Sequence, residues 1–544
     1  MSASDSSGNA PLVVLASSRA VLTLPDDSLV MTPATICISP ATGTILSIIP
    51  SLQPRSAFAP SVTYMDYSPR ILIPGLVDAH VHLNEPGRTE WEGFQTGTKA
   101  AASGGVTTVI DMPLNAIPPT TTLDGFKVKL AASQGQCWVD VGFYGGVIPG
   151  NADQLLPLVE AGVRGFKGFL IDSGVDEFPA VSSTDISLAM TTLKDSPTTL
   201  MFHAEMIPPI SDSVGDAVQQ SLPPLAPRGD LASYSTFLES RPPAFETYAI
   251  EEIVSLADLA PKLHLHIVHL SALECIPILR EARARGINIT AETCFHYLAL
   301  AADHIEDGDT RHKCCPPIRS LSNQDRLWAE LSAPDSCIRT VVSDHSPCTP
   351  ELKLLPLHLQ STTPPSPTSS DIDDRPFMRH SDSGVDVSMP QQEEKPAVAT
   401  VSEIAGDFFA AWGGISSVGL GLPILHTAAA DRAAHGEAVP DLLDIVRLCA
   451  QATAKQVGLA HRKGALRVGM DADVCVFDDE EAWTLNSGGM RWKNKVSPWE
   501  GHTFKGRVRE TWVRGRKVFE FGGRNGGFVG GRPVGRAITE VRRE

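Results

Sequence analysis

The sequence predicts an α/β protein: a TIM-like (β/α)8 barrel with a small β-sandwich domain built from both termini. From Ile71 onward, apolar runs of strand length alternate with Ala- and Leu-rich stretches, a pattern typical of a parallel β/α fold. Polar residues stand at the ends of several of these runs, which favours a barrel with its site at the carboxyl ends of the strands. Both ends of the chain consist instead of short apolar runs separated by turn residues.

Length and composition exclude several classes of protein. The 544 residues exceed one ordinary domain, although a barrel can form a long single unit. A formal net charge of −18 argues against a nucleic-acid-binding surface, and no apolar run is long enough to span a membrane. Residues 1–11 lack the basic start of a secretory signal. Ten cysteines without a Cys-x-x-Cys pair are typical of reduced thiols, so we expect a cytoplasmic protein.

Residues 1–70 are predicted as the amino-terminal part of the small β domain. Pro, Gly, Ser and Asp separate its apolar runs, as in a succession of strands and turns. The expected strands are residues 12–15, 21–22, 35–38 and 45–49.

Residues 71–460 are predicted as the barrel. After the first apolar run, the expected strands are residues 107–112, 139–147, 163–170, 199–203, 263–269, 288–293 and 338–343. Residues 249–259 and 274–285 are examples of the helical stretches between them.

Two further segments complete the chain. Residues 354–399 combine Pro, Ser, Thr, Asp and Gln with few aliphatic residues, which predicts an exposed, disordered insertion that serves as a spacer or a regulatory segment. Residues 461–544 return to short strands at 466–468, 472–477, 508–513 and 517–519, so they are predicted as the carboxyl-terminal part of the small β domain.

The first candidate site residues are His80 and His82, which follow an apolar run. Side chains two residues apart on a strand lie on the same face, so both imidazoles can approach one metal ion. Spacing alone leaves a metal site and a structural role equally open.

Other candidates stand at the ends of later runs. His203 and His269 each end an apolar run, whereas His266 fits a packing or hydrogen-bonding role better because it lies on the opposite face from His269. Asp344 follows an apolar run as well, although an aspartate there can also cap a helix or a turn. Lys167 is flanked by apolar residues, a costly place for a lysine unless it is paired, chemically altered or able to reach the surface.

Together these residues resemble the cyclic amidohydrolase family, which contains dihydroorotases, hydantoinases, dihydropyrimidinases and allantoinases. The resemblance implies six metal ligands: His80, His82, Lys167, His203, His269 and Asp344. It also implies that Lys167 is carbamylated to N6-carboxylysine, because a carbamate can bridge two cations whereas an ammonium group cannot. Two Zn²⁺ ions per subunit suit such a nitrogen- and oxygen-rich set.

Within the family, the sequence resembles the allantoinase branch most, and several segments carry this resemblance. They are residues 82–94, 111–115 with 118–120, 173–179, 343–348, and 406–408 with 412–417. Dihydroorotases carry an arginine two residues after the second metal histidine, and this chain has Asn84 there. An amide can bond a neutral ring but offers no charge to a carboxylate, so the resemblance implies a neutral substrate. The implied substrate-binding residues are Asn84, Asn115, Cys315 and Pro317.

Two positions depart from the family pattern. Cys315 stands where relatives carry serine, and it can replace that residue if the backbone provides the contact. Phe295 stands where relatives often carry proline, which could reshape the pocket wall.

The resemblance implies an enzyme that hydrolyses C–N bonds in cyclic amides. The expected reaction is the opening of the hydantoin ring of allantoin to allantoate, in purine catabolism, by a hydroxide that bridges the two metals, with Asp344 as the catalytic proton carrier. The alternatives are a dihydropyrimidinase or hydantoinase, and a non-catalytic scaffold relative. The expected partner is a small-molecule substrate, with no nucleic acid or membrane, in a homo-oligomer that is a tetramer by family analogy.

Overall fold

The computed structural model describes residues 12–208, 229–360 and 404–543. Most of the predicted insertion, residues 361–399, lies outside this range. The part of it that is described is ordered: Leu354 is buried and its carbonyl accepts a hydrogen bond from the Gly406 N–H. The predicted disorder is therefore wrong at Leu354, which packs against the protein, whereas Leu357 is 86% exposed as the composition predicted.

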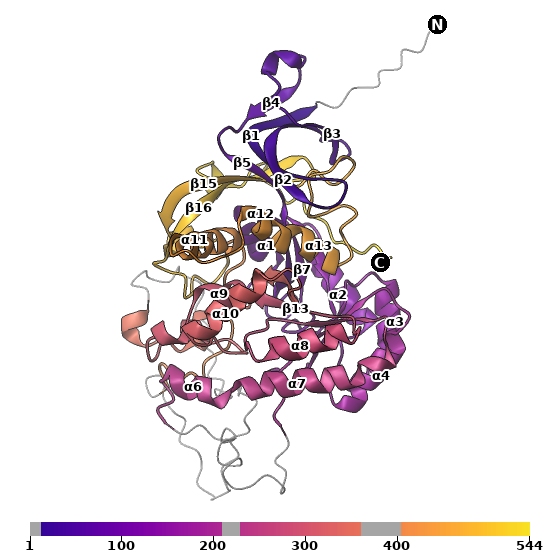
Figure 1. The fold of residues 1–544 in the computed structure, drawn as a ribbon, viewed down its shortest axis with the longest axis vertical. Coiled ribbons are helices and arrows are strands. Elements are labelled where there is room, and N and C mark those ends of the chain that lie inside the picture. Colours follow the sequence, from indigo (N-terminus) through magenta and orange to yellow (C-terminus); the bar gives the residue numbers. More distant parts are fainter. Residues whose placement is uncertain (1–11, 209–228, 361–403, 544) are drawn as a thin grey trace, which may run out of the picture.

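Strands from both ends of the chain form one eight-stranded sheet, here called the terminal sheet. Its order is β17-β16-β15-β5-β1-β2-β3, with β4 paired to β1. Its strands are β1 Val13–Thr23, β2 Leu29–Ser39, β3 Thr44–Ile49, β4 Thr63–Asp66, β5 Ile71–Pro74, β15 Val474–Thr484, β16 Thr503–Val513 and β17 Arg516–Glu520. Figure 1 shows the indigo and yellow ends of the chain lying together at one end of the molecule.

The remaining strands form two sheets in which neighbours run parallel. The orders are β14-β13-β12-β11-β10-β9 and β6-β7-β8. Their bounds are β6 Leu76–Val81, β7 Val106–Asp111, β8 Asp140–Phe143, β9 Gly145–Gly146, β10 Phe166–Phe169, β11 Thr199–His203, β12 His264–Ile267, β13 Ile289–Cys294 and β14 Ile338–Val342. Backbone bonds join both edges of the smaller sheet to the larger one, from His82 N–H to His345 O (2.8 Å) and from Arg164 N–H to Phe143 O (2.7 Å).

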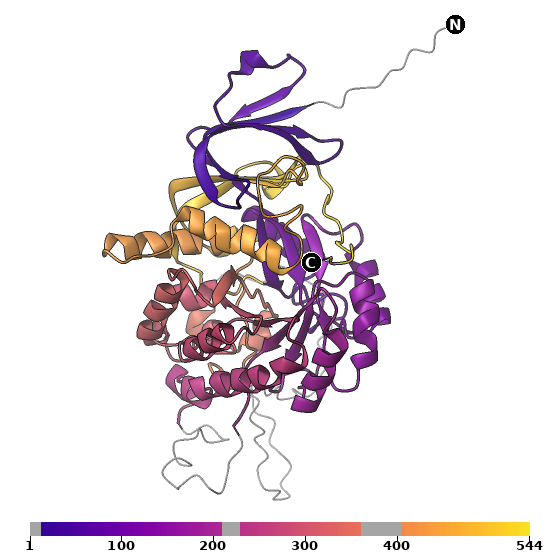
Figure 2. The ribbon, with the colours of Figure 1, turned by 45° about the vertical axis from the view of Figure 1, so that its right-hand side comes forward.

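Helices follow most of the parallel strands and cover their outer side (Figures 1 and 2). They are α1 Phe94–Ser103, α2 Leu123–Ser133, α3 Ala152–Glu160, α4 Ser183–Leu193, α6 Tyr234–Ser240, α7 Pro243–Leu256, α8 Cys275–Ala284, α9 Phe295–Ala299, α10 Leu321–Leu331, α11 Gly421–Ala434, α12 Leu442–Val446 and α13 Ala452–Gln456. None of these helices is long and apolar enough to cross a membrane.

The border between the two regions lies at Gly75, four residues later than the predicted boundary at residue 71. Strand β5 pairs with β1 and β15, so it belongs to the terminal sheet. At Gly75 the chain leaves that sheet, and a Cβ atom there would lie 2.2 Å from Thr107 Oγ1. Only glycine fits where the two regions meet. The sequence analysis did not detect this crossing, because the residues on both sides of Gly75 form one continuous apolar run.

A buried cluster of charged residues forms ion pairs between the terminal sheet and the parallel region. Lys463 Nζ lies 2.7 Å from Asp140 Oδ2 at the start of β8, 2.7 Å from Asp473 Oδ2 and 2.9 Å from Asp471 Oδ2. Three carboxylates this close could hold a metal ion, but the lysine ammonium already occupies the position between them.

Loss of this ammonium should destabilise the protein. We expect Lys463→Met to lower the free energy of unfolding by about 3–5 kcal/mol, because it removes the ammonium from between three carboxylates and leaves the buried Asp473 without its ion pair. Urea denaturation measures the effect. The matched control is Lys127→Met, which removes an exposed pair with Asp124 (2.8 Å) and should leave stability almost unchanged. Equal effects of the two substitutions would contradict the role given to the cluster.

Candidate metal centre

The parallel strands bring the six predicted ligands to one buried place. They come from the carboxyl-terminal parts of five strands or from the residues just beyond them: His80 and His82 from β6, Lys167 from β10, His203 from β11, His269 from β12 and Asp344 from β14. All six are at most 7% exposed. Polar side chains gather here because the carboxyl ends of parallel strands meet at one edge.

Asp344 lies at the centre of the first half of this group. Its Oδ1 atom is 3.1 Å from His80 Nε2 and 3.4 Å from His82 Nε2. Two imidazole nitrogens and a carboxylate oxygen that converge at this distance form a donor set suited to a divalent metal such as zinc.

The second half contains His203, His269 and Lys167. The ring centroids of His203 and His269 are 4.6 Å apart, and the His269 ring lies 5.5 Å from that of His80, which connects the two halves. Lys167 Nζ lies 4.9 Å from the Phe169 ring, which stacks on His203. The Nδ1 atom of His269 is buried without a hydrogen-bond partner, so an additional ligand would satisfy it.

Electrostatics favour the neutral form at three of the four histidines. Burial lowers the pKa of His82 to about 4 and holds the pKa values of His203 and His269 well below the ordinary value. Burial acts in the same direction on the pKa of His80, but the carboxylates of Asp344 and Glu292 outweigh it and raise that pKa to about 9, so a metal ion would displace a proton there. Burial also lowers the pKa of Lys167 to about 8, which makes the uncharged amine accessible near neutral pH. Burial alone would raise the pKa of Asp344, but the nearby His80 outweighs it and keeps the carboxylate ionised. Metal binding requires neutral imidazoles and ionised carboxylates.

Two glutamates that the sequence analysis missed hold the histidines in place. His80 Nδ1 lies 2.6 Å from Glu292 Oε1, and His203 Nε2 lies 2.7 Å from Glu205 Oε2. Such carboxylates fix the tautomer and orientation of a ligating imidazole. A signal was present in the sequence, since a glutamate next to the end of an apolar run, as at Glu292, is as unusual as a lysine there.

The contact between Glu205 and His203 gives a testable prediction. We expect Glu205→Gln to weaken metal binding by roughly 10- to 100-fold, because the neutral amide supports the ligating imidazole less well. Titration with a chelator, followed by elemental analysis, measures this. Glu205 also binds Arg241 (2.6 Å), so Glu330→Gln is the matched control: Glu330 is likewise buried and bonded to an arginine, Arg280 (2.7 Å), but touches no candidate ligand. Unchanged metal affinity in Glu205→Gln would contradict the prediction.

Unusual backbone conformations gather at this site. Of the eight non-glycine residues with positive φ in the described ranges, four belong to it: Asn84 (61°), Asn115 (65°), His269 (39°) and Asp344 (44°). Asparagine, aspartate and histidine are the non-glycine residues that adopt this region most often, but each does so at a cost. The fold therefore holds His269 and Asp344 in strained conformations at the ends of their strands, a common feature of functional sites.

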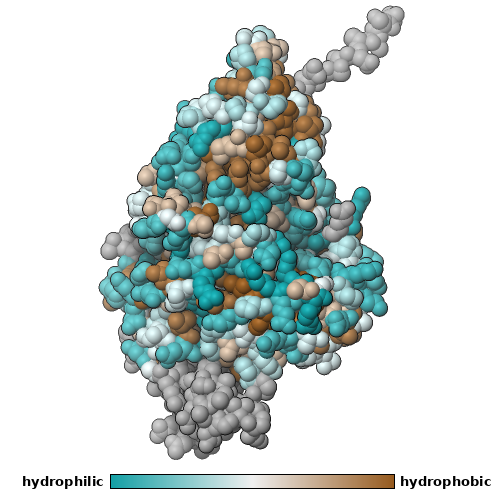
Figure 3. Space-filling view, in the orientation of Figure 1, coloured by the Kyte–Doolittle hydropathy of each residue, from teal (hydrophilic) through white to brown (hydrophobic). Residues whose placement is uncertain are grey.

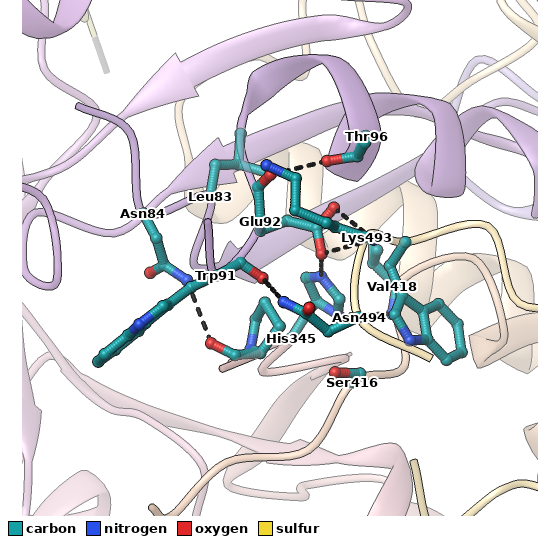
Figure 4. A network of polar contacts seen from close by, with 12 residues as sticks. Leu83, Asn84, Trp91, Glu92, Thr96, His345, Ser416, Val418, Lys493 and Asn494 are labelled. Carbon is teal, nitrogen blue, oxygen red and sulfur yellow. Dashed lines mark hydrogen bonds and ion pairs between the residues drawn. The ribbon is translucent and has the colours of Figure 1, made fainter. Parts of the chain in front are cut away.

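A network of buried polar contacts supports the backbone next to Asp344 (Figure 4). His345 Nδ1 accepts from the N–H groups of Ser417 (3.1 Å) and Val418 (3.4 Å), and its Nε2 faces Glu92 Oε2 at 3.5 Å. Glu92 also accepts from the Lys493 N–H at 3.1 Å, so the segment that contains Lys493 packs against this network from a distant part of the chain. The sequence analysis did not foresee this return of the chain.

The predicted substrate-binding residues occupy different positions relative to the metal ligands. Asn115 Nδ2 lies 3.4 Å from His82 Nδ1, and Asn84 Nδ2 donates to Pro347 O (3.3 Å), just beyond Asp344. The side-chain oxygens of both asparagines are buried without a hydrogen-bond partner. Cys315 is half-buried, and the Pro317 carbonyl already accepts a bond from Ser271 Oγ at 2.7 Å.

Phe295 does not shape this group of ligands in the expected way. A Cβ atom at Gly421 would lie 2.2 Å from its ring, so the ring packs against α11. The departure at this position is therefore accommodated by a glycine on a neighbouring helix.

Comparisons with known proteins agree with this site. A family model described as the amidohydrolase family matches residues 71–213, and a second of that description matches residues 424–519. An allantoinase of Saccharomyces cerevisiae is 44% identical over 94% of this chain and 96% of its own, and an allantoinase of Streptomyces avermitilis is 36% identical over 90% and 92%. An L-hydantoinase (dihydropyrimidinase) from Arthrobacter aurescens matches the fold with a TM-score of 0.76 and 24% identity, over 97% of this chain and 99% of that one.

The chain belongs to the cyclic amidohydrolase family, as its sequence motifs predicted. Within that family it groups with the allantoinases, since curated members from fungi and bacteria align over nearly its whole length.

Proposed function

We propose that this protein is an allantoinase, which opens the hydantoin ring of allantoin by hydrolysis to give allantoate. One observation carries the proposal: a chain 44% identical to a yeast allantoinase has all six candidate ligand side chains, and all six are buried. A non-catalytic relative would be expected to lose some of these ligands, and this chain has them all.

The donor set supports a metal cofactor, for which we propose two Zn²⁺ ions. His80, His82 and Asp344 would hold one ion and His203 and His269 the other, with a carbamylated Lys167 as the shared ligand. When bound, the metal would activate a water molecule near neutral pH and polarise the ring carbonyl.

The residues of the chain perform the remaining steps. The Asp344 carboxylate accepts the proton of the attacking water and delivers it to the ring nitrogen that leaves. Asn84 and Asn115, whose side-chain oxygens lack partners, can accept hydrogen bonds from the N–H groups of a neutral ring. The backbone at Cys315 and Pro317 completes the orientation of the ring in this proposal.

The larger-scale predictions belong to the same proposal. We infer that the two parallel sheets close into one (β/α)8 barrel, because β6 and β8 bond to residues next to β14 and β10. The terminal sheet would form the small β sandwich beside it. Figure 3 shows hydrophobic side chains gathered over this end of the molecule, and Leu46 on β3 is 49% exposed, which supports a homo-oligomer. A cytoplasmic location and a tetramer remain expectations from the sequence.

A substrate panel tests the proposal. Purified protein with its full metal content should open allantoin much faster than hydantoin, dihydrouracil or dihydroorotate. Dihydroorotate should react least, because Asn84 offers no charge to its carboxylate. Intact allantoin together with opened dihydrouracil would transfer the protein to the dihydropyrimidinases. A protein that binds no zinc after expression in zinc-replete medium, and opens none of the four, would be a scaffold relative.

A further inference from the structure

His296 is a buried polar residue that the proposed mechanism does not use. It lies in the first turn of α9, directly beyond the end of β13, and is 1% exposed. Both of its ring nitrogens are buried without a hydrogen-bond partner, while the edge of its ring packs against Tyr297 at 4.3 Å between centroids. Burying unsatisfied polar atoms costs free energy, so such a group in a native protein calls for an explanation.

The other buried histidines do not share this property. In the described ranges, His296 is the only histidine with both ring nitrogens buried and unpartnered. His264, which is half-buried at the start of β12, shows the usual arrangement: its two nitrogens contact Thr199 Oγ1 (3.1 Å) and Thr290 Oγ1 (2.8 Å). A structural histidine in this protein is therefore satisfied by its neighbours, and His296 is not.

The position of His296 indicates what could satisfy it. A ring nitrogen of His296, the Cys294 thiol and an Asp344 oxygen all lie within 4.8 Å of one another. Asp344 in turn contacts His80 and His82. The imidazole thus lies beside the carboxylate that hands a proton to the leaving nitrogen in the proposed reaction.

We propose that His296 is a substrate-binding residue that hydrogen-bonds the cyclic amide at its leaving nitrogen, next to Asp344. This inference rests on the proposed function. Burial lowers the pKa of His296 to about 4, so the ring is neutral at neutral pH. A neutral imidazole has one donor and one acceptor, which match the alternating N–H and C=O groups of a cyclic ureide.

Two substitutions of His296 and one control test this role. His296→Phe should lower kcat/KM by roughly 10- to 100-fold, the loss expected for a hydrogen bond to the substrate, with an unchanged metal content. Its urea unfolding midpoint should stay the same or rise, because two unsatisfied polar atoms are removed. His296→Gln, which keeps a donor and an acceptor, should recover part of the lost kcat/KM.

The control is His264→Phe, which should lower the unfolding midpoint and leave kcat/KM within about twofold, because it removes satisfied hydrogen bonds away from the ligands. A His296→Phe protein that is less stable but equally active would overturn the inference, and so would a loss of bound metal, which would make His296 a ligand.

The wild-type protein separates this inference from the proposed function. If it opens another cyclic amide in place of allantoin and the His296 variants lose that activity, only the substrate is wrong. If it opens allantoin and the variants do so equally well, only the role of His296 is wrong. A wild-type protein that opens no cyclic amide would overturn both.

Discussion

Replacement of Asp344 by asparagine should abolish turnover of allantoin, with kcat lowered by about 10²- to 10⁴-fold, while most of the metal remains bound. The amide keeps an oxygen near His80 Nε2, 3.1 Å away in the native protein, so it can still contribute to binding of the ion. It cannot accept the proton of the attacking water, since the lone pair and charge of the second carboxylate oxygen are gone. Steady-state kinetics and elemental analysis of the same sample measure both quantities.

A comparison of the metal content of Asp344→Asn with its turnover distinguishes a proton carrier from a metal ligand. A loss of zinc in proportion to the loss of turnover would make the aspartate mainly a ligand and contradict its role as proton carrier. Asp309→Asn is the matched control: this carboxylate is also buried and lies 2.7 Å from Arg311, in a separate ion pair. Its removal should affect stability and leave kcat and metal content unchanged.

The grouping of the candidate ligands could be predicted from the sequence because of where polar residues stand in a parallel β/α protein. His203 and Asp344 each interrupt or follow an apolar run, and the carboxyl ends of parallel strands meet at one edge. The position of a polar residue at the end of an apolar run therefore indicated that it lies beside the other candidate ligands. The apolar neighbours of Lys167 marked it as unusual, and the family motifs then supplied the modification that would make it a ligand.

The supporting residues could not be predicted in the same way. Glu292 is 212 residues from His80 along the chain, and only the register of β13 brings its carboxylate to the imidazole. The return of Lys493 to Glu92 depends on the loop between β15 and β16 of the terminal sheet, for which no periodic signal exists. The crossing at Gly75 was hidden because residues on both sides of it are apolar and buried, although they belong to different sheets.

Lys167→Ala should remove the bridging ligand and with it much of the bound metal and nearly all activity. The side chain is 1% exposed, and burial at this depth is a poor environment for a permanent ammonium charge, which the Phe169 ring 4.9 Å from Nζ offsets only in part. Burial lowers its pKa to about 8, and the amine must lose its proton before it can form a carbamate. We therefore expect the native side chain to act as an anion, and the alanine variant to lack that charge between the two halves of the site.

Chemical rescue distinguishes this role from a structural one. A short aliphatic carboxylate fits the space left by the lysine side chain and supplies two oxygens and one negative charge, so it should restore metal content and activity together in a concentration-dependent manner. Lys463→Met is the appropriate control, because it also removes a buried lysine charge but should lose stability without losing metal per folded molecule. Full metal content in Lys167→Ala without added carboxylate would show that the bridge is not needed, and the two-metal arrangement would then have to rest on the four histidines and Asp344 alone.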